Sequence, residues 1–348
     1  MTVPLSDDNL KRLRQVFDLP ELSGTPYELV RKLGSGGMAE VYLARDRELA
    51  RLVAVKVLSL AEDNSASALR MTREARIVAR LEHPGIVPIH DFGVLPDGRA
   101  FYVMKYVEGA TLENYADQNH NLTDLLRVFL KVCDTIAFAH ARGVFHRDLK
   151  PANIMIGSFG EALVMDWGIA LVREDVDPRL HESAVDAGAT TRDTAHGTIL
   201  GTPAYMSPEQ ARGDVAAISV KSDIYSLGAL LYYMLTREAP YSGESSEAIR
   251  MNVIAGTLVE PREKNSSIAR PLNAICLKAM RVDPEQRYSN CAALADDIKN
   301  FLDQLPVSAY RENILERLLR FIGKNRVIVF MIVGYMLIRL LFFLRSGF

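Results

Sequence analysis

The chain has 348 residues, of which 49% are hydrophobic and 24% charged, so it is long enough for two or three packed units and is neither disordered nor fibrous in composition. Its 41 basic and 43 acidic residues give a formal net charge of −2, which excludes recruitment of nucleic acid by a global positive field. The three cysteines, Cys133, Cys276 and Cys291, lack CxxC or Cys/His spacing, which argues against a disulfide framework and a zinc site and fits a reducing cytosol.

Residues 1–26 are predicted to form an N-terminal extension. A short amphipathic pattern over residues 7–17 is followed by a Pro/Ser/Gly-rich linker, LPELSGTP. The first residues have no apolar core, so we expect a solvated extension and no secretory signal here.

From Tyr27 to Val107 the pattern favours strands, and beyond Thr111 helical periods dominate. The strand-like runs are YELVRKLG, EVYLARD, LVAVKVL, GIVPIHDFG and AFYVMKYV, interrupted by one helix from about Ser67 to Glu82. The second part has long helical periods and short strands near NIMIG and EALVMD. A small strand-rich part followed by a larger helical part predicts an α+β arrangement of two lobes.

A glycine-rich turn, GSGGMAEV, lies between the first two predicted strands. Its glycines, Gly34, Gly36 and Gly37, would let backbone N–H groups approach a phosphate. Such a turn is more often a plain hairpin, so on its own it is a weak indication of a nucleotide site.

Lys56 ends an apolar alternation, where an inward-facing lysine needs a counter-charge, although most strand lysines are simply exposed. Glu74 lies on the apolar stripe of the predicted helix, where an unpaired acid is costly. The pattern therefore indicates an ion pair between Lys56 and Glu74. Arg70, Arg73 and Arg76 on the same helix remain alternative partners of Glu74.

The stretch HRDLKPAN lies between a predicted helix and the strand-like NIMIG. Asp148 can accept a hydroxyl proton, Lys150 can neutralise a phosphate and Asn153 offers an amide oxygen to magnesium. With these residues the chain resembles the protein kinase superfamily over residues 27 to about 303. Three sequence motifs resemble those of the bacterial eukaryotic-like (Hanks-type) serine/threonine protein kinases: GSGGMAEVYLA, HRDLKPANIM and GTPAYMSPEQ.

The resemblance implies a bilobal kinase fold, with the small lobe over residues 27–109 and the large lobe over residues 110–305, and a role for each matching residue. The catalytic set that it implies is Lys56, Glu74, Asp148, Lys150, Asn153 and Thr202. The ATP-binding set that it implies, with Met104 as gatekeeper, is Leu33, Gly34, Ser35, Gly36, Gly37, Val41, Ala54, Lys56, Met104, Lys105 and Val107. Mg²⁺, with Mn²⁺ as an alternative, would be held by Asn153 and Asp166.

Two Asp-aromatic-Gly triplets compete as the metal-binding turn, in IHDFG (89–93) and VMDWG (164–168). In the family this triplet follows the catalytic loop, and Asp166 comes 166 − 148 = 18 residues after Asp148. The resemblance therefore selects Asp166. Asp91 precedes the segment that resembles the adenine-binding hinge, so we interpret IHDFG as the end of a strand.

Three residues depart from the family's usual pattern, but none is catalytic. Ala39 stands at the third glycine of the nucleotide loop, and Lys105 stands at a hinge position that acts through its backbone. Trp167 replaces a phenylalanine, and its larger ring is expected to resist swinging Asp166 out of the site. Two further matches imply scaffold roles, for the pair Glu209 and Arg287 and for Asp223, which ties down the catalytic loop.

The preferred hypothesis is a serine/threonine protein kinase acting on protein hydroxyls with ATP. A pseudokinase or nucleotide-binding scaffold is the alternative, which the intact catalytic set disfavours, and a small-molecule kinase would usually lack the GTPAYMSPEQ platform. Arg147 beside the catalytic Asp148 suggests regulation by phosphorylation between residues 166 and 209. The candidate acceptors there are Thr190, Thr191, Thr194 and Thr198. An unmodified flexible loop is the alternative, and a homodimer for autophosphorylation is left open.

The C-terminal part predicts a membrane anchor. Residues 306–326 form a basic amphipathic juxtamembrane segment, and residues 327–344 are a candidate transmembrane helix of 18 residues with one charge, Arg339. We expect a single-pass protein of the cell membrane with a cytoplasmic kinase domain. A helix lying on the membrane or packed on the large lobe or a partner is the alternative. The expected partners are therefore ATP, protein substrates and the membrane, without nucleic acid.

Overall fold

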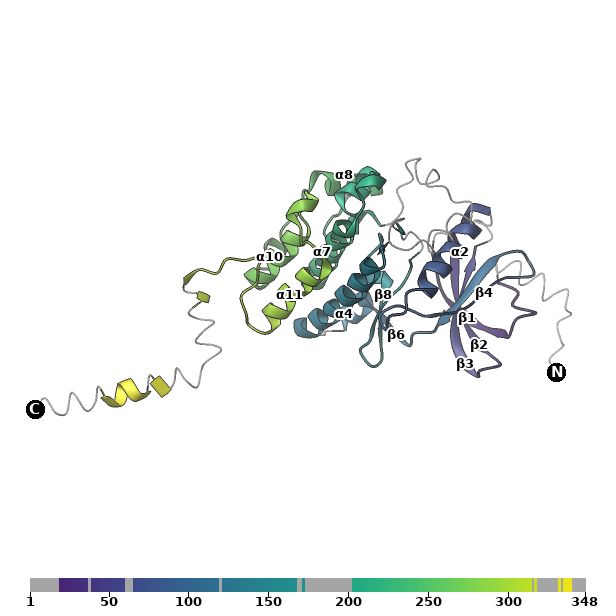
Figure 1. The fold of residues 1–348 in the computed structure, drawn as a ribbon, viewed down its shortest axis with the longest axis horizontal. Coiled ribbons are helices and arrows are strands. Elements are labelled where there is room, and N and C mark those ends of the chain that lie inside the picture. The colour runs from purple at the N-terminus through teal and green to yellow at the C-terminus, as the bar shows by residue number, and fades with distance from the viewer. Residues whose placement is uncertain are drawn as a thin grey trace, which may run out of the picture.

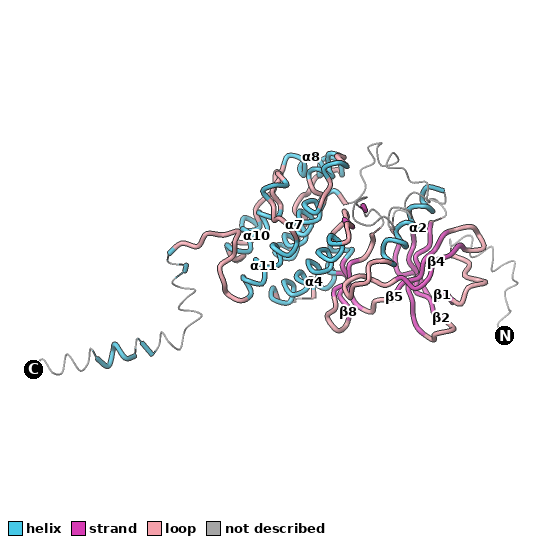
Figure 2. The backbone as a smooth tube through the Cα atoms, viewed as in Figure 1, coloured by secondary structure: helices cyan, strands magenta, loops and turns pink. Residues whose placement is uncertain are grey.

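The computed structural model describes residues 19–36, 39–59, 65–118, 121–167, 171–172, 202–314, 316–317, 331–332 and 334–339. These residues form a strand-rich lobe followed by a helical lobe (Figures 1 and 2). The predicted α+β two-lobe arrangement is therefore correct. The amphipathic pattern at residues 7–17 lies outside the described residues.

The small lobe is an antiparallel five-stranded sheet with one helix packed against it. The strand order is β1-β2-β3-β5-β4. The elements are β1 (Tyr27–Ser35), β2 (Ala39–Asp46), β3 (Arg51–Leu58), β4 (Ile89–Val94), β5 (Ala100–Lys105) and the helix α2 (Ser65–Ala79). The helix ends earlier than predicted, because Arg80 and Leu81 donate to the carbonyls three residues back, at 3.2 and 3.0 Å. Such a tightened turn precedes Pro84, which disfavours helix at the residue before it.

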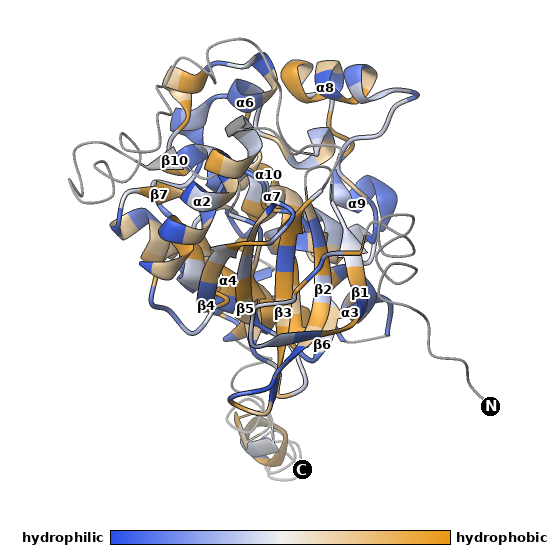
Figure 3. Cartoon of the chain, turned by 90° about the vertical axis from the view of Figure 1, so that its right-hand side faces the viewer, coloured by the Kyte–Doolittle hydropathy of each residue, from blue (hydrophilic) through white to orange (hydrophobic). Residues whose placement is uncertain are grey.

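The alternation along β3 divides its side chains between the two faces of the sheet. Val53, Val55 and Val57 are buried in one apolar cluster on the face away from α2. Ala54 and Lys56 therefore point to the opposite face, toward α2 and the large lobe. Figure 3 shows that hydrophobic residues gather on the central strands of this sheet.

The large lobe is built around helix α7, whose side chains are almost all buried. Its helices are α3 (Leu112–Asp117), α4 (Leu122–Ala141), α6 (Pro208–Arg212), α7 (Val220–Thr236), α8 (Ser246–Ala255), α9 (Pro261–Lys264), α10 (Arg270–Ala279) and α11 (Cys291–Leu302). Gly228 lets α7 approach α10 closely, because a Cβ there would lie 2.8 Å from the Cβ of Ala279. One apolar core joins α4, α7, α10 and α11.

Short strands line the junction of the lobes. The strands β6 (Gly109–Thr111), β8 (Ile154–Gly157) and β9 (Ala162–Val164) form a small sheet, and β7 (Val144–Phe145) pairs with β10 (Leu171–Val172). The amide of Val164 donates to the carbonyl of Gly85 at 2.8 Å, which links β9 to the segment between α2 and β4 of the small lobe. Because β9 pairs with β8, the strand that follows the loop after β7 is connected to the small lobe through β9.

The structure leaves the predicted membrane anchor largely outside its description. Residues 331–332 and 334–339 are helical. Within the described part of the chain, no helix combines the length and the apolar character needed to cross a membrane.

Candidate active site

Lys56 lies between two carboxylates that come from different lobes. Its Nζ is 2.8 Å from Oε1 of Glu74 on α2 and 2.9 Å from Oδ1 of Asp166. Burial opposes the charge on Lys56, but Tyr102, Glu74 and Asp166 outweigh it and raise the pKa of Lys56 well above its usual value. The predicted pair of Lys56 and Glu74 is therefore formed, and the lysine stays charged.

Tyr102 fixes the position of Glu74, a role that the sequence analysis missed. Its hydroxyl donates to Oε1 of Glu74 at 2.9 Å, and the whole residue is buried. Burial and the nearby Glu74 carboxylate raise the pKa of Tyr102, so the hydroxyl remains a donor. In the sheet Tyr102 pairs with Lys56. Because side chains alternate between the two faces of a strand, the sequence of β5 could have indicated that Tyr102 lies on the same face of the sheet as Lys56.

The loop after β7 gathers the groups suited to phosphoryl transfer. Lys150 Nζ is 2.9 Å from Oδ2 of Asp148 and 2.9 Å from Oγ1 of Thr202. The amide of Thr202 donates to the other oxygen of Asp148 at 3.3 Å. The side-chain amide of Asn153 donates to the Asp148 carbonyl at 2.8 Å and to its carboxylate at 3.0 Å. Asp148 is therefore held in one orientation by groups on both sides.

Asp223 of α7 anchors the backbone of this loop. Its carboxylate accepts from the amides of His146 and Arg147, both at 2.9 Å, and lies 2.8 Å from Nε2 of His140. Burial opposes ionisation, but the bond and charge of His140 outweigh it and lower the pKa of Asp223. The sequence analysis missed Gln210, whose side-chain amide donates to the Arg147 carbonyl at 2.7 Å.

The triplet at 166–168 begins in a strained backbone conformation. Asp166 has φ +57° and Arg147 has φ +70°, values that non-glycine residues adopt mainly where surrounding contacts enforce them, often at functional sites. Trp167 is 2% exposed, its ring lies 4.6 Å from that of His146, and its Nε1 donates to the Val164 carbonyl at 3.3 Å. Burial opposes ionisation of Asp166, but Lys56 outweighs it and lowers the pKa of Asp166.

The residues predicted to bind the nucleotide surround the same junction. Ala54 pairs with Met104 and Val53 with Lys105, which brings β3 against the hinge. Two residues after Lys105, Val107 packs in an apolar cluster with Leu163 and the partly buried Met155. Leu163 and Met155 therefore lie beside Val107, a residue predicted to bind the nucleotide. The sequence analysis did not include them in the site, because an apolar residue of a short strand is equally expected in a core.

The glycine-rich turn is described only in part. Val41 pairs with Gly34 on one side and with Lys56 on the other, so the turn leads directly to the lysine. A Cβ at Gly34 would meet no described atom within 4 Å, and one at Gly36 would lie 3.6 Å from the Ala39 carbonyl. The amide of Gly36 donates to that carbonyl at 2.8 Å. Leu33 and Ser35 lie on the same strand, β1. Gly37 lies outside the described residues.

The other triplet, at residues 91–93, lies in the small lobe. IHDFG makes up most of β4, an edge strand, so our interpretation of it as the end of a strand is wrong in detail. Asp91 accepts a hydrogen bond from the Tyr27 hydroxyl at 3.0 Å. Burial and the Asp91 carboxylate raise the pKa of Tyr27 to about 12. Asp91 thus has a structural contact in the small lobe.

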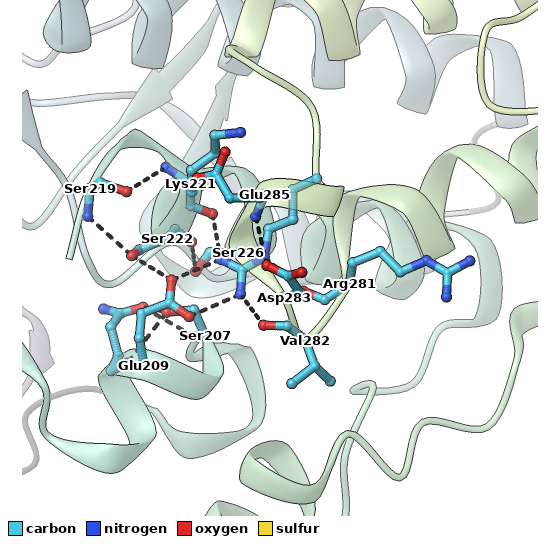
Figure 4. Close-up of polar contacts among 12 residues, drawn as sticks. Ser207, Glu209, Ser219, Lys221, Ser222, Ser226, Arg281, Val282, Asp283 and Glu285 are labelled. Atoms are coloured by element: carbon cyan, nitrogen blue, oxygen red, sulfur yellow. Dashed lines mark hydrogen bonds and ion pairs between the residues drawn. The ribbon is translucent and has the colours of Figure 1, made fainter. Parts of the chain in front are cut away.

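The pair Glu209 and Arg287 joins α6 to the segment before α11 inside the large lobe. Figure 4 shows Glu209 and Ser222 within this network. Two bonds of 2.7 and 2.9 Å connect the guanidinium to the carboxylate, and Ser222 donates a third at 2.7 Å. Arg287 also donates to backbone carbonyls, at Lys221, Arg281 and Val282. This network connects the platform after Thr202 to the rest of the lobe.

A lysine paired with a helix acid in a small β-lobe, facing a loop that presents Asp148, Lys150 and Asn153, is the arrangement shared by protein kinases. The chain belongs to the protein kinase domain family, which matches residues 27–298.

Comparison with curated proteins identifies bacterial serine/threonine kinases as relatives. The chain is 40% identical over 279 residues to the serine/threonine-protein kinase PknB of Mycobacterium tuberculosis, covering 78% of this chain and 42% of that protein. It is 37% identical over 300 residues to the serine/threonine-protein kinase PknD of Chlamydia abortus, covering 80% of this chain and 31% of that protein. The chain therefore spans about a third to two fifths of the length of these relatives.

Proposed function

We propose that the chain is an active serine/threonine protein kinase that transfers the γ-phosphate of ATP to hydroxyls of proteins. One observation carries this proposal: Lys56 contacts both Glu74 and Asp166, at 2.8 and 2.9 Å. A kinase site requires this lysine–glutamate pair together with the aspartate of the triplet. A pseudokinase has no need of the complete set, so the same contacts disfavour that alternative.

The oxygen donors present fit Mg²⁺. The side-chain nitrogen of Asn153 donates to Asp148, so its amide oxygen could coordinate a metal. Asp166 offers Oδ2 in addition to the Oδ1 that contacts Lys56. Hard oxygen ligands from one or two side chains, completed by phosphates, are what Mg²⁺ prefers. When bound, the ion would neutralise charge on the phosphates of ATP.

The remaining chemistry belongs to the catalytic loop. Asp148 would orient the incoming hydroxyl and accept its proton, since its carboxylate is fixed by Lys150, Asn153 and Thr202. Lys150 would lie beside the transferring phosphoryl group and stabilise its charge. Lys56 would bind the phosphates that remain on the nucleotide. Thr202 joins the platform to this loop, which supports hydroxyls of serine and threonine as acceptors.

Incubation with ATP, Mg²⁺ and a generic basic protein tests the proposal. The wild-type chain is expected to label serine or threonine, while Asp148→Asn, which is nearly isosteric, is expected to label neither. Equal labelling by both variants, or no labelling by a folded wild type, would contradict it.

We further propose regulation by phosphorylation of the segment between Asp166 and Glu209. The Nε atoms of Arg73 and Arg147 are buried and have no hydrogen-bond partner among the described residues. Burial lowers the pKa of both guanidinium groups. At Arg147 the Asp223 carboxylate opposes this shift, while the charge of Arg73 adds to it. Two partly buried cations that repel each other would be stabilised by a phosphate between them.

Mass spectrometry tests this regulation. Phosphate is expected on a threonine between residues 183 and 202 of active protein, and its absence there would contradict the proposal. If the amount of phosphate incorporated per molecule rises with protein concentration, one copy phosphorylates another. That result would support the homodimer expected for autophosphorylation.

Membrane attachment through residues 327–344, with the kinase in the cytoplasm, is a separate proposal. Its support is the apolar run and the basic residues on its kinase side. The exposure of the described side chains of this run also supports the proposal. The side chains that are more than half exposed are those of Met331, Ile332, Tyr335, Met336, Leu337 and Ile338. The full chain is expected to stay in the membrane fraction through a carbonate wash, unlike a version ending at Pro306. Release by the wash would contradict a spanning helix.

A further inference from the structure

A basic pocket of about 590 Å³ lies on the large lobe, lined by helices α9 and α10 and by residues 308–310. This volume lies within the range of about 300–1,000 Å³ that is usual for small-molecule sites. The charged residues of its lining are all cations: Arg262, Arg270, Lys278 and Arg281. None of the residues predicted for catalysis or nucleotide binding lines it.

The wall formed by residues 308–310 is fixed by a buried carboxylate. Asp297 of α11 is 3% exposed and accepts from the amide and hydroxyl of Ser308, at 2.6 and 2.8 Å, and from the amide of Ala309 at 3.1 Å. Lys278 donates to the Ser308 hydroxyl at 3.0 Å, and its Nζ lies 4.2 Å above the ring of Tyr288. The basic pocket is thus formed without a ligand, which lowers the entropy lost on binding.

The cations differ in how far the described residues use their donors. The guanidinium of Arg281 makes no side-chain hydrogen bond to any residue that the structure describes. Arg262 donates from NH1 to the Ile268 carbonyl, and Arg270 forms an ion pair of 3.0 Å with Glu316. Four positive charges surround one cavity, and the ion pair between Arg270 and Glu316 offsets one of them. This excess of positive charge favours an anion with several acceptor oxygens.

We propose that the basic pocket binds the phosphate headgroup of an anionic membrane lipid. A soluble phosphate compound has the same chemistry, but the pocket's position favours the lipid. Its wall at residues 308–310 continues directly into the C-terminal tail, which begins at residue 311 and in Figure 1 leaves the lobe beside α10. The tail carries further cations before the apolar run, at Arg311, Arg317, Arg320, Lys324 and Arg326. Basic residues next to a membrane attract anionic lipids. The choice of lipid rests on the proposed membrane attachment.

Native mass spectrometry of the full chain in neutral detergent tests the pocket, titrated with short-chain phosphatidylglycerol and, separately, with short-chain phosphatidylcholine. The wild type is expected to bind the anionic lipid with higher affinity. Lys278→Gln/Arg281→Gln and the single variant Arg281→Glu each change the charge by two units. Each is expected to weaken this binding about 30-fold, because one basic side chain contributes about a factor of five near anionic lipid.

Arg127→Glu is the matched control, because Arg127 is a well-exposed cation of the same lobe outside the basic pocket. It is expected to bind the lipid as the wild type does, and kinase activity should be unchanged in all variants. Equal affinity for the two lipids, or an equal loss in Arg127→Glu, would overturn the proposal. Tighter binding of glycerol phosphate or of a phosphothreonine peptide than of phosphatidylglycerol would overturn the lipid as ligand.

The titration does not depend on whether residues 327–344 span a bilayer. If the carbonate wash releases the chain from the membrane but the chain binds the anionic lipid in detergent, only the proposed membrane anchor is contradicted. A chain that resists the wash but binds both lipids equally contradicts the pocket alone.

Discussion

Replacing Arg287 by methionine should destabilise the large lobe, although the residue lies away from the reacting groups. Glu209 and Arg287 are 3% and 4% exposed. Arg287→Met leaves the carboxylate with Ser222 as its remaining side-chain donor, and breaking one half of a buried ion pair costs about 3–5 kcal/mol. For the matched residues 27–298, about 270 residues at about 2.1 cal/mol/K each give an unfolding entropy near 0.6 kcal/mol/K, so Tm should fall by about 5–9 °C.

Differential scanning calorimetry measures this effect in wild type, Arg287→Met and the double variant Glu209→Leu/Arg287→Met. The double variant should recover part of the loss, because removing both charges leaves no unpaired carboxylate in the interior. A fall in Tm below about 2 °C for the single variant, or a double variant no more stable than the single one, would refute the reasoning.

The pH dependence of the same pair has a defined sign. Burial opposes ionisation of Glu209, but the hydrogen bonds and charge of Arg287 outweigh it and lower the pKa of Glu209. A depressed carboxylate pKa contributes stability above the unfolded value, about 4.3, and that stability is lost as pH falls through the folded pKa. The difference in Tm between wild type and the double variant should therefore be constant from about pH 7 to pH 5 and decrease below about pH 4. A decrease that is complete by pH 6 would contradict this account.

Three further predictions concern single side chains. Asp166→Asn should lower phosphoryl transfer at saturating ATP by several orders of magnitude, while Asp91→Asn should leave it nearly intact; a dead Asp91→Asn would show that our choice of triplet is wrong. Tyr102→Phe removes a hydrogen bond to Glu74 worth about 1 kcal/mol, so kcat should fall about fivefold; an unchanged kcat would mean that the hydroxyl does not position the acid. Burial raises the pKa of all three cysteine thiols, so iodoacetamide at pH 8 should label none of them in the native chain and all of them in denaturant.

The catalytic loop could be predicted because its chemistry is local in the sequence. Asp148, Lys150 and Asn153 lie within six consecutive residues, so any fold that presents the loop presents them together. The pair Lys56 and Glu74 was accessible for another reason, since two periodic patterns each left one charge on an apolar face. In both cases the residue types and their spacing contained the relevant physics.

Other contacts left no comparable pattern. Gln210 reaches the Arg147 carbonyl over 63 positions of sequence, and a bond from a side chain to a backbone group does not depend on which residue supplies the carbonyl. The basic pocket needs residues 308–310 to fold back against α10, and this return depends on one buried acid, Asp297. The end of α2 was misjudged because the apolar stripe continues past the last regular turn of the helix.

The packing of Trp167 has a consequence for which ligands the site can accept. Inverting the triplet would expose an indole that is now 2% accessible, break its bond to the Val164 carbonyl and separate it from the His146 ring. Exposing about 200 Å² of aromatic surface costs about 5 kcal/mol. A compound that binds only the inverted form must offset that amount, which would weaken its apparent affinity several thousandfold. Inhibitor libraries for this chain should therefore be built around scaffolds that leave Asp166 facing Lys56.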